Sequence, residues 1–415
     1  MRILYNLSIR LYCFVVCCLS LTNKKAKLWI TGRKNILLHL KEAIQPDDNI
    51  IWFHCASLGE FEQGRPLIEY IQKKQPQYKI LLTFFSPSGY EIRKNYPDVD
   101  YVFYLPADTE FNAKKFMEIV RPQYIFFIKY EFWLNYIRQA YLREIPFYSV
   151  SSIFSKRQIY FKWYGKWFRK QLQEITHFFT QDQSSMDLLN QYGIFQTSVS
   201  GDTRFDRVYE LSVNRKEIPL FSQIKQYDKT IVAGSTWRED EQLLFQMIKK
   251  YNFRLILAPH EIDSQHIKQI ESLFSDFPTI RYSQISDNVQ VDEKQVLIVD
   301  TIGILSSLYP YGKIAYIGGG FGVGIHNILE AATYGMPVIF GPNYKKFKEA
   351  NDLIALSAAF SISNAKELDA VLDNLFENRK NLEIASRQAK QYVLDNIGAC
   401  NRIYSFVFDG KGKTF

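Results

Sequence analysis

The sequence predicts an α/β protein with two doubly wound, Rossmann-like domains, each a parallel sheet with helices on both faces. Short apolar runs rich in aromatic and β-branched residues alternate with helical stretches through both halves of the chain. Such alternation is typical of parallel sheets. The pattern lapses into a polar, proline-containing segment at residues 211–228. We therefore expect a linker there, between domains at 36–210 and 229–415 that face a central cleft.

The expected strands are the apolar runs bounded by Pro, Gly or Ser. In the first domain they are NIIWFHCAS (49–57), YKILLTFFS (78–86), PQYIFFIKY (122–130), IPFYSVSS (145–152) and ITHFFTQD (175–182). In the second they are KTIVAGST (229–236), FRLILAPH (253–260), QVLIVDT (295–301), KIAYIGGG (313–320) and MPVIFGP (336–342).

Composition excludes a disordered chain and indicates an anionic partner. The 415 residues are 47% apolar and 23% charged, which is ordinary for a globular protein with room for two cores. The net charge is +8, and all of the excess lies in residues 1–210. A membrane surface, a phosphorylated lipid or nucleic acid would suit such a basic half.

The five cysteines have neither a metal-ligand spacing nor the pattern of a disulfide framework. They are Cys13, Cys17, Cys18, Cys55 and Cys400. A reducing, cytosolic compartment is the simplest interpretation.

Residues 1–35 form a separate apolar and basic segment. An apolar stretch of about a dozen residues, Leu11–Leu21, is shorter than the roughly 20 residues that a spanning helix needs. It lies between basic residues at 2 and 10 and a basic cluster at 24–34, without a signal-peptide cleavage site. We interpret it as a helix that lies on or dips into a membrane, with its basic flanks on anionic headgroups. A core helix of the first domain is the alternative.

The stretch SKRQIYFKWYGKWFRK, residues 155–170, mixes six cations with six aromatic side chains. This mixture suits a lipid headgroup interface. It would also suit single-stranded nucleic acid, or a helix packed on its aromatic side.

Three charged residues of the first domain are candidates for catalysis because they follow expected strands. Glu60 lies in CASLGEFEQG, Glu131 in FFIKYEFWLN and Arg204 in VSGDTRFDR. Loops at the carboxyl ends of parallel strands carry the chemistry of such sheets, so Glu60 is a candidate base. Arg204 could bind a carboxylate or phosphate through two N–H groups. A helix-start acid for Glu60 and ion-pair roles for Glu131 and Arg204 are the structural alternatives.

In the second domain, the glycine-rich segment IAYIGGGFGVGIHNILEAATYGMPVIFGP (314–342) indicates a nucleotide-sugar site. Its glycines allow backbone to approach a ligand, and a helix expected to begin near His326 offers N–H groups to a phosphate. Glu330 could accept hydrogen bonds from a ribose. Ser235 and Thr236 could cap a helix or bind an anion, and His260 stands at a strand end.

Together, these motifs resemble the 3-deoxy-D-manno-octulosonic acid (Kdo) transferases of lipopolysaccharide synthesis, which have the GT-B glycosyltransferase fold. The matching segments, in order along nearly the whole chain, are HCASLGE (54–60), KYEFWLN (129–135), GDTRFDR (201–207), GSTWREDE (234–241), APHEID (258–263) and GIHNILEAATYGMPVIFGP (324–342).

The resemblance implies inverting transfer of Kdo from CMP-Kdo to lipid IVA, at the cytoplasmic face of the inner membrane of a Gram-negative bacterium. It implies Glu60 as general base and Glu131 and Arg204 as groups that stabilise the transition state. The implied CMP contacts are Pro259, His260, Ile302, Gly303, Ile304, Asn327, Ile328, Leu329 and Glu330. No metal, no cofactor and no nucleic-acid partner are expected.

Several positions depart from the family pattern. Ala258-Pro259-His260 stands where Pro-Arg-His is common, and Arg204 stands where Lys is frequent. An acid that often follows Met-Gly has no counterpart in Ile302-Gly303-Ile304. Two other functions remain open: a GT-B transferase with a UDP-sugar donor and another lipid acceptor, or a non-catalytic protein that binds a membrane surface.

Overall fold

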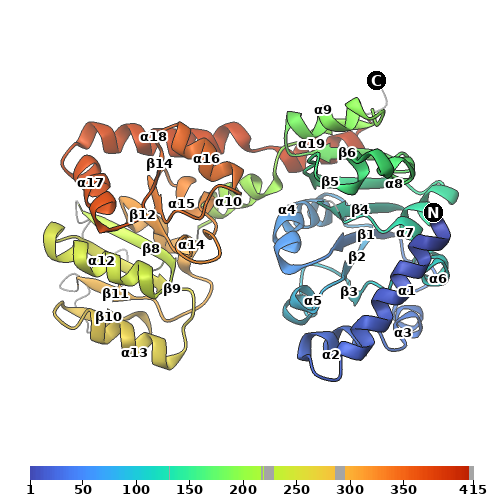
Figure 1. Cartoon of the computed structure of the whole chain (residues 1–415), viewed down its shortest axis with the longest axis horizontal. Coiled ribbons are helices and arrows are strands. Elements are labelled where there is room, and N and C mark those ends of the chain that lie inside the picture. The colour runs from blue at the N-terminus through green and yellow to red at the C-terminus, as the bar shows by residue number, and fades with distance from the viewer. Residues whose placement is uncertain (130, 216–217, 219–228, 286–294, 411–415) are drawn as a thin grey trace. The chain divides into compact units, whose positions relative to one another are not determined.

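The chain forms two compact units, each built on a parallel sheet (Figure 1). The computed structural model describes residues 1–129, 131–215, 218, 229–285 and 295–410. Unit 1 comprises Met1–Asp206 and Gly398–Phe415, and unit 2 comprises Arg207–Ile397.

The sheet of unit 1 has seven parallel strands in the order β3-β2-β1-β4-β5-β6-β7. The strands are β1 (Ile50–Cys55), β2 (Lys79–Phe84), β3 (Tyr101–Tyr104), β4 (Tyr124–Ile128), β5 (Phe147–Ser152), β6 (His177–Thr180) and β7 (Thr197–Val199).

Alternate residues of these strands supply two separate cores, one on each face of the sheet. Ile50 and Trp52 join a cluster that includes Phe116 of α6 and Ile137 of α7. Ile51 and Phe53 join a cluster with α4 and the C-terminal helix α19. The helices are α1 (Arg2–Leu19), α2 (Lys24–Thr31), α3 (Ile36–Ala43), α4 (Leu58–Lys74), α5 (Pro87–Arg93), α6 (Glu110–Val120), α7 (Leu134–Leu142), η1 (Ile159–Phe161), η2 (Trp163–Gly165), α8 (Lys166–Leu172), α9 (Gln183–Gln191) and α19 (Ala399–Phe408).

The sheet of unit 2 repeats the same winding, in the order β10-β11-β9-β8-β12-β13-β14. Its strands are β8 (Thr230–Thr236), β9 (Arg254–Pro259), β10 (Thr279–Arg281), β11 (Val296–Ile298), β12 (Ile314–Ile317), β13 (Val338–Phe340) and β14 (Ala359–Ser361). Its helices are α12 (Arg238–Tyr251), α13 (Ser264–Leu273), η3 (Tyr282–Gln284), α14 (Leu305–Leu308), η5 (Tyr309–Tyr311), α15 (Leu329–Ala332), α16 (Lys348–Ala355), α17 (Ala365–Phe376) and α18 (Arg379–Asn396). Helix α10 (Thr203–Val213) begins in unit 1 and ends in unit 2.

The predicted α/β class and all ten predicted strands are confirmed. Four strands lack a prediction: β3, β7, β10 and β14. All four lie at the edges of their sheets. They are three or four residues long and largely half-buried, so they lack the continuous apolar run that marks a central strand.

The limits of the two units differ from the expected domains at the C-terminus. Residues 398–410 were expected in the second domain, but α19 packs on α4 of unit 1. The carboxylate of Asp206 accepts hydrogen bonds from the N–H groups of Gly398 and Cys400. Of the linker expected at 211–228, residues 216–217 and 219–228 lie outside the described residues.

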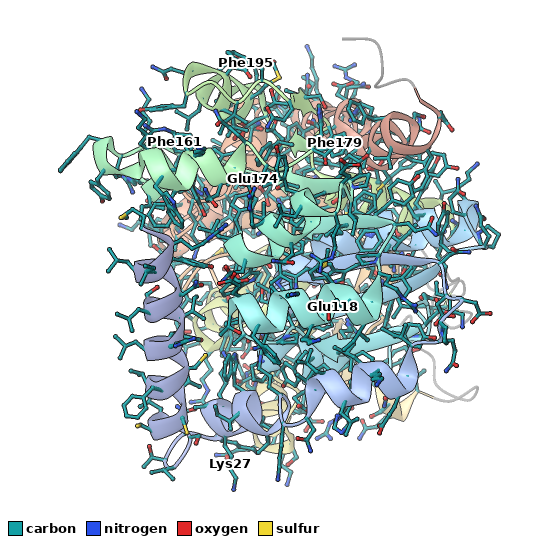
Figure 2. All side chains as sticks on the ribbon, turned by 90° about the vertical axis from the view of Figure 1, so that its right-hand side faces the viewer. Lys27, Glu118, Phe161, Glu174, Phe179 and Phe195 are labelled. Atoms are coloured by element: carbon teal, nitrogen blue, oxygen red, sulfur yellow. The ribbon has the colours of Figure 1, made fainter. Side chains whose placement is uncertain are left out.

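Helix α1 is longer than the expected apolar stretch and is not a core helix. It begins at Arg2, and Val16 is its one buried residue. Ile3, Leu4, Leu7 and Leu11 are each more than half exposed. Figure 2 shows α1 along the edge of unit 1, with side chains on its outer side directed away from the ribbon. By length and composition alone, it is long and apolar enough to cross a membrane.

The basic, aromatic stretch at 155–170 divides its aromatic residues between core and surface. Phe161 is buried, whereas Trp163 is 91% exposed and Tyr164 is also exposed. The Trp167 ring contacts the ring of Tyr5 in α1, with centroids 6.2 Å apart. The stretch therefore lies beside one end of α1.

Candidate active site

Each sheet has a point where the winding reverses, and the predicted site residues follow the strands beside it. In unit 1 the reversal lies between β1 and β4, and in unit 2 between β8 and β12. Ligands of open parallel sheets bind outside the carboxyl ends of the strands at this point. Glu60 follows β1 and Glu131 follows β4, so the fold brings these two acids to one place.

Glu60 is a buried carboxyl group in the first turn of α4. Its side chain is 7% exposed, and its Oε2 accepts a hydrogen bond from the Ala56 N–H at 2.5 Å. Burial, followed by the nearby Glu131 carboxylate, raises the pKa of Glu60 to about 7, although the Ala56 N–H and the Lys129 charge favour the ionised form. Burial thus outweighs the helix N-terminus, and Glu60 can exchange a proton near neutral pH.

Glu131 lies in the loop between β4 and α7, and burial also raises its pKa. The loop begins with Lys129 in a left-handed conformation (φ 64°), which is unusual for a residue with a side chain. The Lys129 N–H donates to Val150 O, and Lys129 O accepts from the Ser149 hydroxyl, so β5 holds this backbone turn.

A buried hydrogen-bond chain from β1 fixes the end of the same loop. Thr83 Oγ1 accepts from Trp52 Nε1 at 2.8 Å and donates to Phe53 O at 3.3 Å, so it accepts from His54 Nδ1 at 2.9 Å. His54 Nε2 then accepts from Trp133 Nε1 at 3.2 Å. Burial lowers the pKa of His54 to about 3, which keeps the ring neutral as this chain requires.

Arg204 lies in the first turn of α10 and is held by Asp202. Its Nε and Nη2 donate to Asp202 Oδ2 at 2.8 and 2.7 Å. Gln63, one turn after Glu60 on α4, donates to Asp202 Oδ1 at 3.0 Å. The edge of Arg204 that was expected to bind a donor anion therefore contacts Asp202, and an anion at that edge would compete with this carboxylate.

Tyr12 of α1 also belongs to this region, although it was not predicted from the sequence. It interacts electrostatically with both Glu131 and Arg33. Its ring packs against Phe85, which contacts Trp133 with centroids 4.5 Å apart. A signal existed, because Tyr5 and Tyr12 are seven residues apart and so share one face of an otherwise apolar helix.

In unit 2, an aromatic stack joins the ends of β8 and β9 to the glycine-rich segment. The exposed His260 ring stacks on both Trp237 and His326, with ring centroids 4.8 and 4.4 Å away and interplanar angles of 27°. Trp237 Nε1 also donates to His326 Nε2 at 3.5 Å. Burial, followed by the nearby His260, lowers the pKa of His326. Trp237 was not predicted as a site residue, although it directly follows the Gly-Ser-Thr end of a strand.

Thr236 is less available to a ligand than expected. It is fully buried, and its hydroxyl donates to Glu241 Oε1 at 3.1 Å. Glu241 in turn contacts His266, whose other ring nitrogen bonds Glu261 O. Ser235, in contrast, is half-buried and has a left-handed backbone (φ 54°), as at other strand ends of this chain.

The glycines at the end of β12 allow close backbone contact at the reversal point. A Cβ on Gly318 would lie 2.2 Å from Ser235 O and 2.6 Å from Thr236 Cα. Gly319 has a φ of 86°, and its N–H donates to Asp240, which also accepts from the Tyr316 hydroxyl. These glycines are therefore needed for the close packing of β12 on β8, whether or not their backbone also contacts a ligand.

The remaining predicted donor residues lie on two neighbouring loops. Ile302 and Gly303 are exposed, Ile304 is half-buried, and the adjoining Leu305 packs against Gly234 of β8. The Asn327 amide donates to Glu330 Oε1 at 3.0 Å. The side chains of Ile328 and Leu329 are buried in the core, so only their backbone can contact a ligand.

The helix expected to begin near His326 begins three residues later, although it carries Glu330 as expected. Helix α15 begins at Leu329 and has four residues. The Asn327 side chain accepts a hydrogen bond from the Leu329 N–H, the first N–H of this helix. A single turn has a small dipole, so the phosphate contact expected there would depend on individual N–H groups.

A cation not predicted from the sequence lies beside the glycine-rich segment. Lys346 Nζ donates to Val323 O at 3.0 Å, next to Gly324. Over the described ranges, no group of three or more His, Cys, Asp or Glu side chains is arranged to hold a metal ion.

Comparisons with known proteins agree with the predicted family. The family model of the 3-deoxy-D-manno-octulosonic-acid transferases (kdotransferases) matches residues 31–207. A 3-deoxy-D-manno-octulosonic acid transferase of Aquifex aeolicus is 28% identical over 86% of this chain and 95% of that protein. The transferase of Haemophilus influenzae is 27% identical over 86% of each chain.

Solved structures share the fold at low sequence identity. A UDP-GlcNAc 2-epimerase from Neisseria meningitidis has a TM-score of 0.62 and 15% identity, covering 87% of this chain and 100% of that one. MurG from Acinetobacter baumannii has a TM-score of 0.56 and 13% identity, covering 87% and 99%. Both agree with two Rossmann-like units of the GT-B class. Through its motifs, the family model over residues 31–207 and its sequence relatives, the chain is similar to the Kdo transferases, and these similarities identify it as a glycosyltransferase.

Proposed function

We propose that this chain transfers Kdo from CMP-Kdo to lipid IVA, with inversion at the anomeric carbon and with Glu60 as general base. The observation that carries the proposal is the buried Glu60 carboxyl group, whose pKa is raised to about 7 beside a second acid at the reversal point of unit 1. The names of the sequence relatives support the transferred sugar.

Glu60 takes the proton of the acceptor hydroxyl as its oxygen attacks the anomeric carbon of the donor. The new glycosidic bond forms while the bond from that carbon to the CMP phosphate oxygen breaks, and CMP leaves with its electron pair. A carboxylate with a pKa near 7 suits this task, because at neutral pH much of it is ionised and it still binds a proton well.

Glu131 and Arg204 stabilise the transition state in this proposal. The Glu131 carboxylate also makes Glu60 more basic through like-charge repulsion. Arg204 brings a positive charge next to α4, where it can offset the charge of the Kdo carboxylate or the leaving phosphate. Exchange of Asp202 for a substrate anion would release the Arg204 side chain to do so.

Unit 2 binds the donor in this proposal. The contacts are Ser235, the backbone of Thr236, Pro259, His260, Ile302–Ile304 and Asn327–Glu330, joined by Trp237 and His326. The exposed edge of the stacked His260 offers a flat surface beside a hydrogen-bonding nitrogen. Lys346 is our candidate for the donor-side cation that replaces the family's usual arginine near His260.

Unit 1 contacts the cytoplasmic face of the inner membrane in this proposal, where it meets the lipid acceptor. The support is the exposed apolar surface of α1 and the exposed Trp163 and Tyr164 among the cations of 155–170. Such a surface combines apolar burial with attraction to anionic headgroups.

The test is incubation of the full chain with CMP-Kdo and lipid IVA, followed by mass spectrometry of the lipid. We expect the lipid to gain the mass of Kdo with the wild type. Glu60→Gln should be about 10³-fold less active and give no detectable product. Glu62→Gln, which changes an ion-paired acid on the same helix, is the matched control. Unmodified lipid with the wild type, or transfer from a UDP-sugar instead, would contradict the proposed donor and acceptor.

A further inference from the structure

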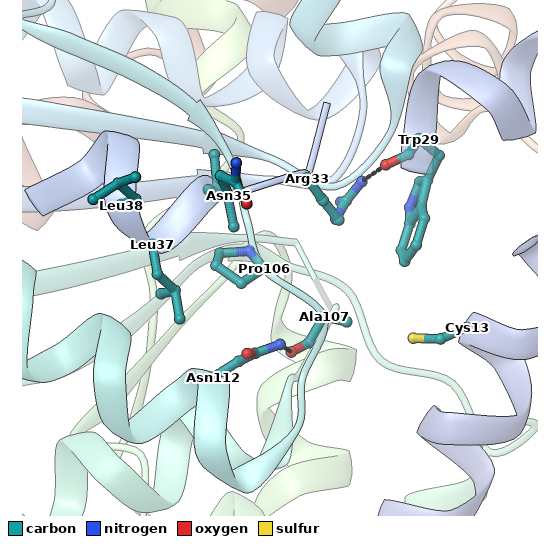
Figure 3. Close-up of a pocket in the computed structure, with 10 residues that line it drawn as sticks. Cys13, Trp29, Arg33, Asn35, Leu37, Leu38, Pro106, Ala107 and Asn112 are labelled. Atoms are coloured by element: carbon teal, nitrogen blue, oxygen red, sulfur yellow. Dashed lines mark hydrogen bonds between the residues drawn. The ribbon is translucent and has the colours of Figure 1, made fainter. Parts of the chain in front are cut away.

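A cavity of about 280 Å³ lies in unit 1 between α1, α2, α3 and the loop that follows β3 (Figure 3). Its polar wall includes Trp29 and Arg33, and Cys13 of α1 borders it. Much of the remaining lining is apolar, with Ile36, Leu37, Leu38 and Pro106. None of the proposed catalytic residues Glu60, Glu131 and Arg204 lines it, and neither do the proposed donor contacts.

Arg33 brings a half-buried cation to this cavity without an acidic partner in the described part of the chain. Its Nε donates to Leu105 O, one Nη to Trp29 O and the other to Phe85 O, at 2.7–3.1 Å. Burial lowers its pKa to about 10, so the side chain is still charged at neutral pH. A guanidinium has five N–H donors, and these three bonds leave two. The rings of Trp29, Phe85 and Tyr104, with centroids 3.9–5.0 Å from the guanidinium carbon, offset part of its charge but supply no counter-ion.

Trp29 adds a second donor that lacks a partner. Its side chain is 6% exposed, and its buried Nε1 has no hydrogen-bond acceptor among the residues that the structure describes. Figure 3 shows the indole nitrogen on the edge of the ring toward Arg33, and the guanidinium lies 3.9 Å from the ring centroid. Orphaned buried donors are rare and point to a missing acceptor.

From this arrangement, we propose that the cavity binds the phosphate group of a membrane lipid, with Arg33 and Trp29 Nε1 as its donors. Arg33 has two N–H groups beyond its three hydrogen bonds, and Trp29 Nε1 is an unsatisfied donor. Both groups are donors and one is cationic, so the complementary group is an anion with several acceptor oxygens. The apolar lining and the contact with α1 select a lipid phosphate over a free one. This choice of source rests on the proposed membrane contact of α1, whereas the anion site rests on the cavity itself.

The experiment measures binding by titration calorimetry to the full chain in a neutral detergent, without donor or acceptor sugar. The probes are dihexanoyl phosphatidic acid, dihexanoyl phosphatidylcholine and inorganic phosphate. We expect phosphatidic acid to bind at least tenfold more tightly than the other two. Because catalysis is not measured, failure of this site and failure of the proposed Kdo transfer give separate results.

Trp29→Phe removes the unpaired N–H but keeps an aromatic ring, so it tests the site without removing a paired group. We expect it to weaken phosphatidic acid binding about tenfold while the melting temperature is unchanged or higher. Arg33→Gln should weaken binding at least tenfold. Lys34→Gln removes an adjacent exposed cation and should change binding less than about twofold.

Three results would overturn the proposal. Wild-type affinity in Trp29→Phe would show that the indole N–H does not bind the anion. An equal loss in Lys34→Gln and Arg33→Gln would indicate general electrostatic attraction. Equal affinity for inorganic phosphate and phosphatidic acid would make the cavity a free-phosphate site instead.

Discussion

Glu60→Gln should abolish transfer and yet stabilise unit 1 at alkaline pH. Because the folded pKa of Glu60, about 7, is above its ordinary value of 4.5, the folded chain holds this proton more tightly than the unfolded chain does. The resulting stability is fully present below pH 4.5 and is lost as the pH rises through 7. The difference corresponds to roughly 3 kcal/mol. A neutral glutamine avoids this cost and can still accept the Ala56 N–H.

Differential scanning calorimetry at pH 5 and pH 8 would measure the effect. At pH 8 we expect the transition of unit 1 in Glu60→Gln to lie several degrees above that of the wild type, with a smaller difference at pH 5. Glu62→Gln should instead lose up to about 1 kcal/mol at pH 8, because it breaks an ion pair with Arg93, and should retain activity.

A lower melting temperature of Glu60→Gln at pH 8 would refute this reasoning. Glu60 would then be an acid that stabilises the start of α4 through the helix dipole. A helix-start acid and a buried base with a raised pKa thus predict opposite changes in the melting temperature of Glu60→Gln at pH 8.

Three further predictions follow from the two sites. Glu131→Gln should shift the acidic limb of the kcat/KM profile from about pH 7 toward, but not down to, 4.5, because burial is the larger cause of the raised Glu60 pKa and remains in this variant. An unshifted limb would show that Glu131 does not influence the pKa of Glu60. Trp237→Ala should weaken CMP binding about 2- to 10-fold by calorimetry, whereas the exposed Trp163→Ala should not, and equal affinities would remove the stack from the donor site. Gly318→Ala should lower the free energy of unfolding by on the order of 1–3 kcal/mol in thermal unfolding, because its Cβ would meet the backbone of β8. Gly322→Ala, whose Cβ would meet only Gly319 O at 3.7 Å, should be nearly neutral. Similar losses in the two variants would contradict the close packing at the reversal point.

The central strands could be predicted from the sequence because burial on both faces requires a continuous apolar run, as in NIIWFHCAS. The edge strand β10, Thr279–Arg281, could not, because half-exposed short strands have no such composition. The position of Glu60 after β1 was equally predictable. Its raised pKa was not, because it depends on burial and on Glu131, which lies 71 residues away in the chain.

Side-chain availability was the other quantity that the sequence could not supply. Thr236 is a plausible anion ligand in a Gly-Ser-Thr strand end, but its hydroxyl is bonded to Glu241 five residues later. Arg204 has the chemistry to bind a phosphate, but Asp202 already contacts it. In both cases the competing partner is close in sequence, so local acids near a proposed cationic or hydroxyl ligand deserve equal weight in such predictions.

The contacts of α1 connect the proposed membrane surface with the proposed catalytic loop. The Tyr5 hydroxyl donates to the buried Asp108, whose carboxylate also accepts from the N–H groups of Asn135 and Tyr136 at the start of α7. That helix begins directly after the loop of Glu131. A shift of α1 would therefore break hydrogen bonds that hold one end of this loop. The N-terminal helix is thus a structural part of unit 1, and its removal should disturb the environment of Glu131 as well as membrane contact.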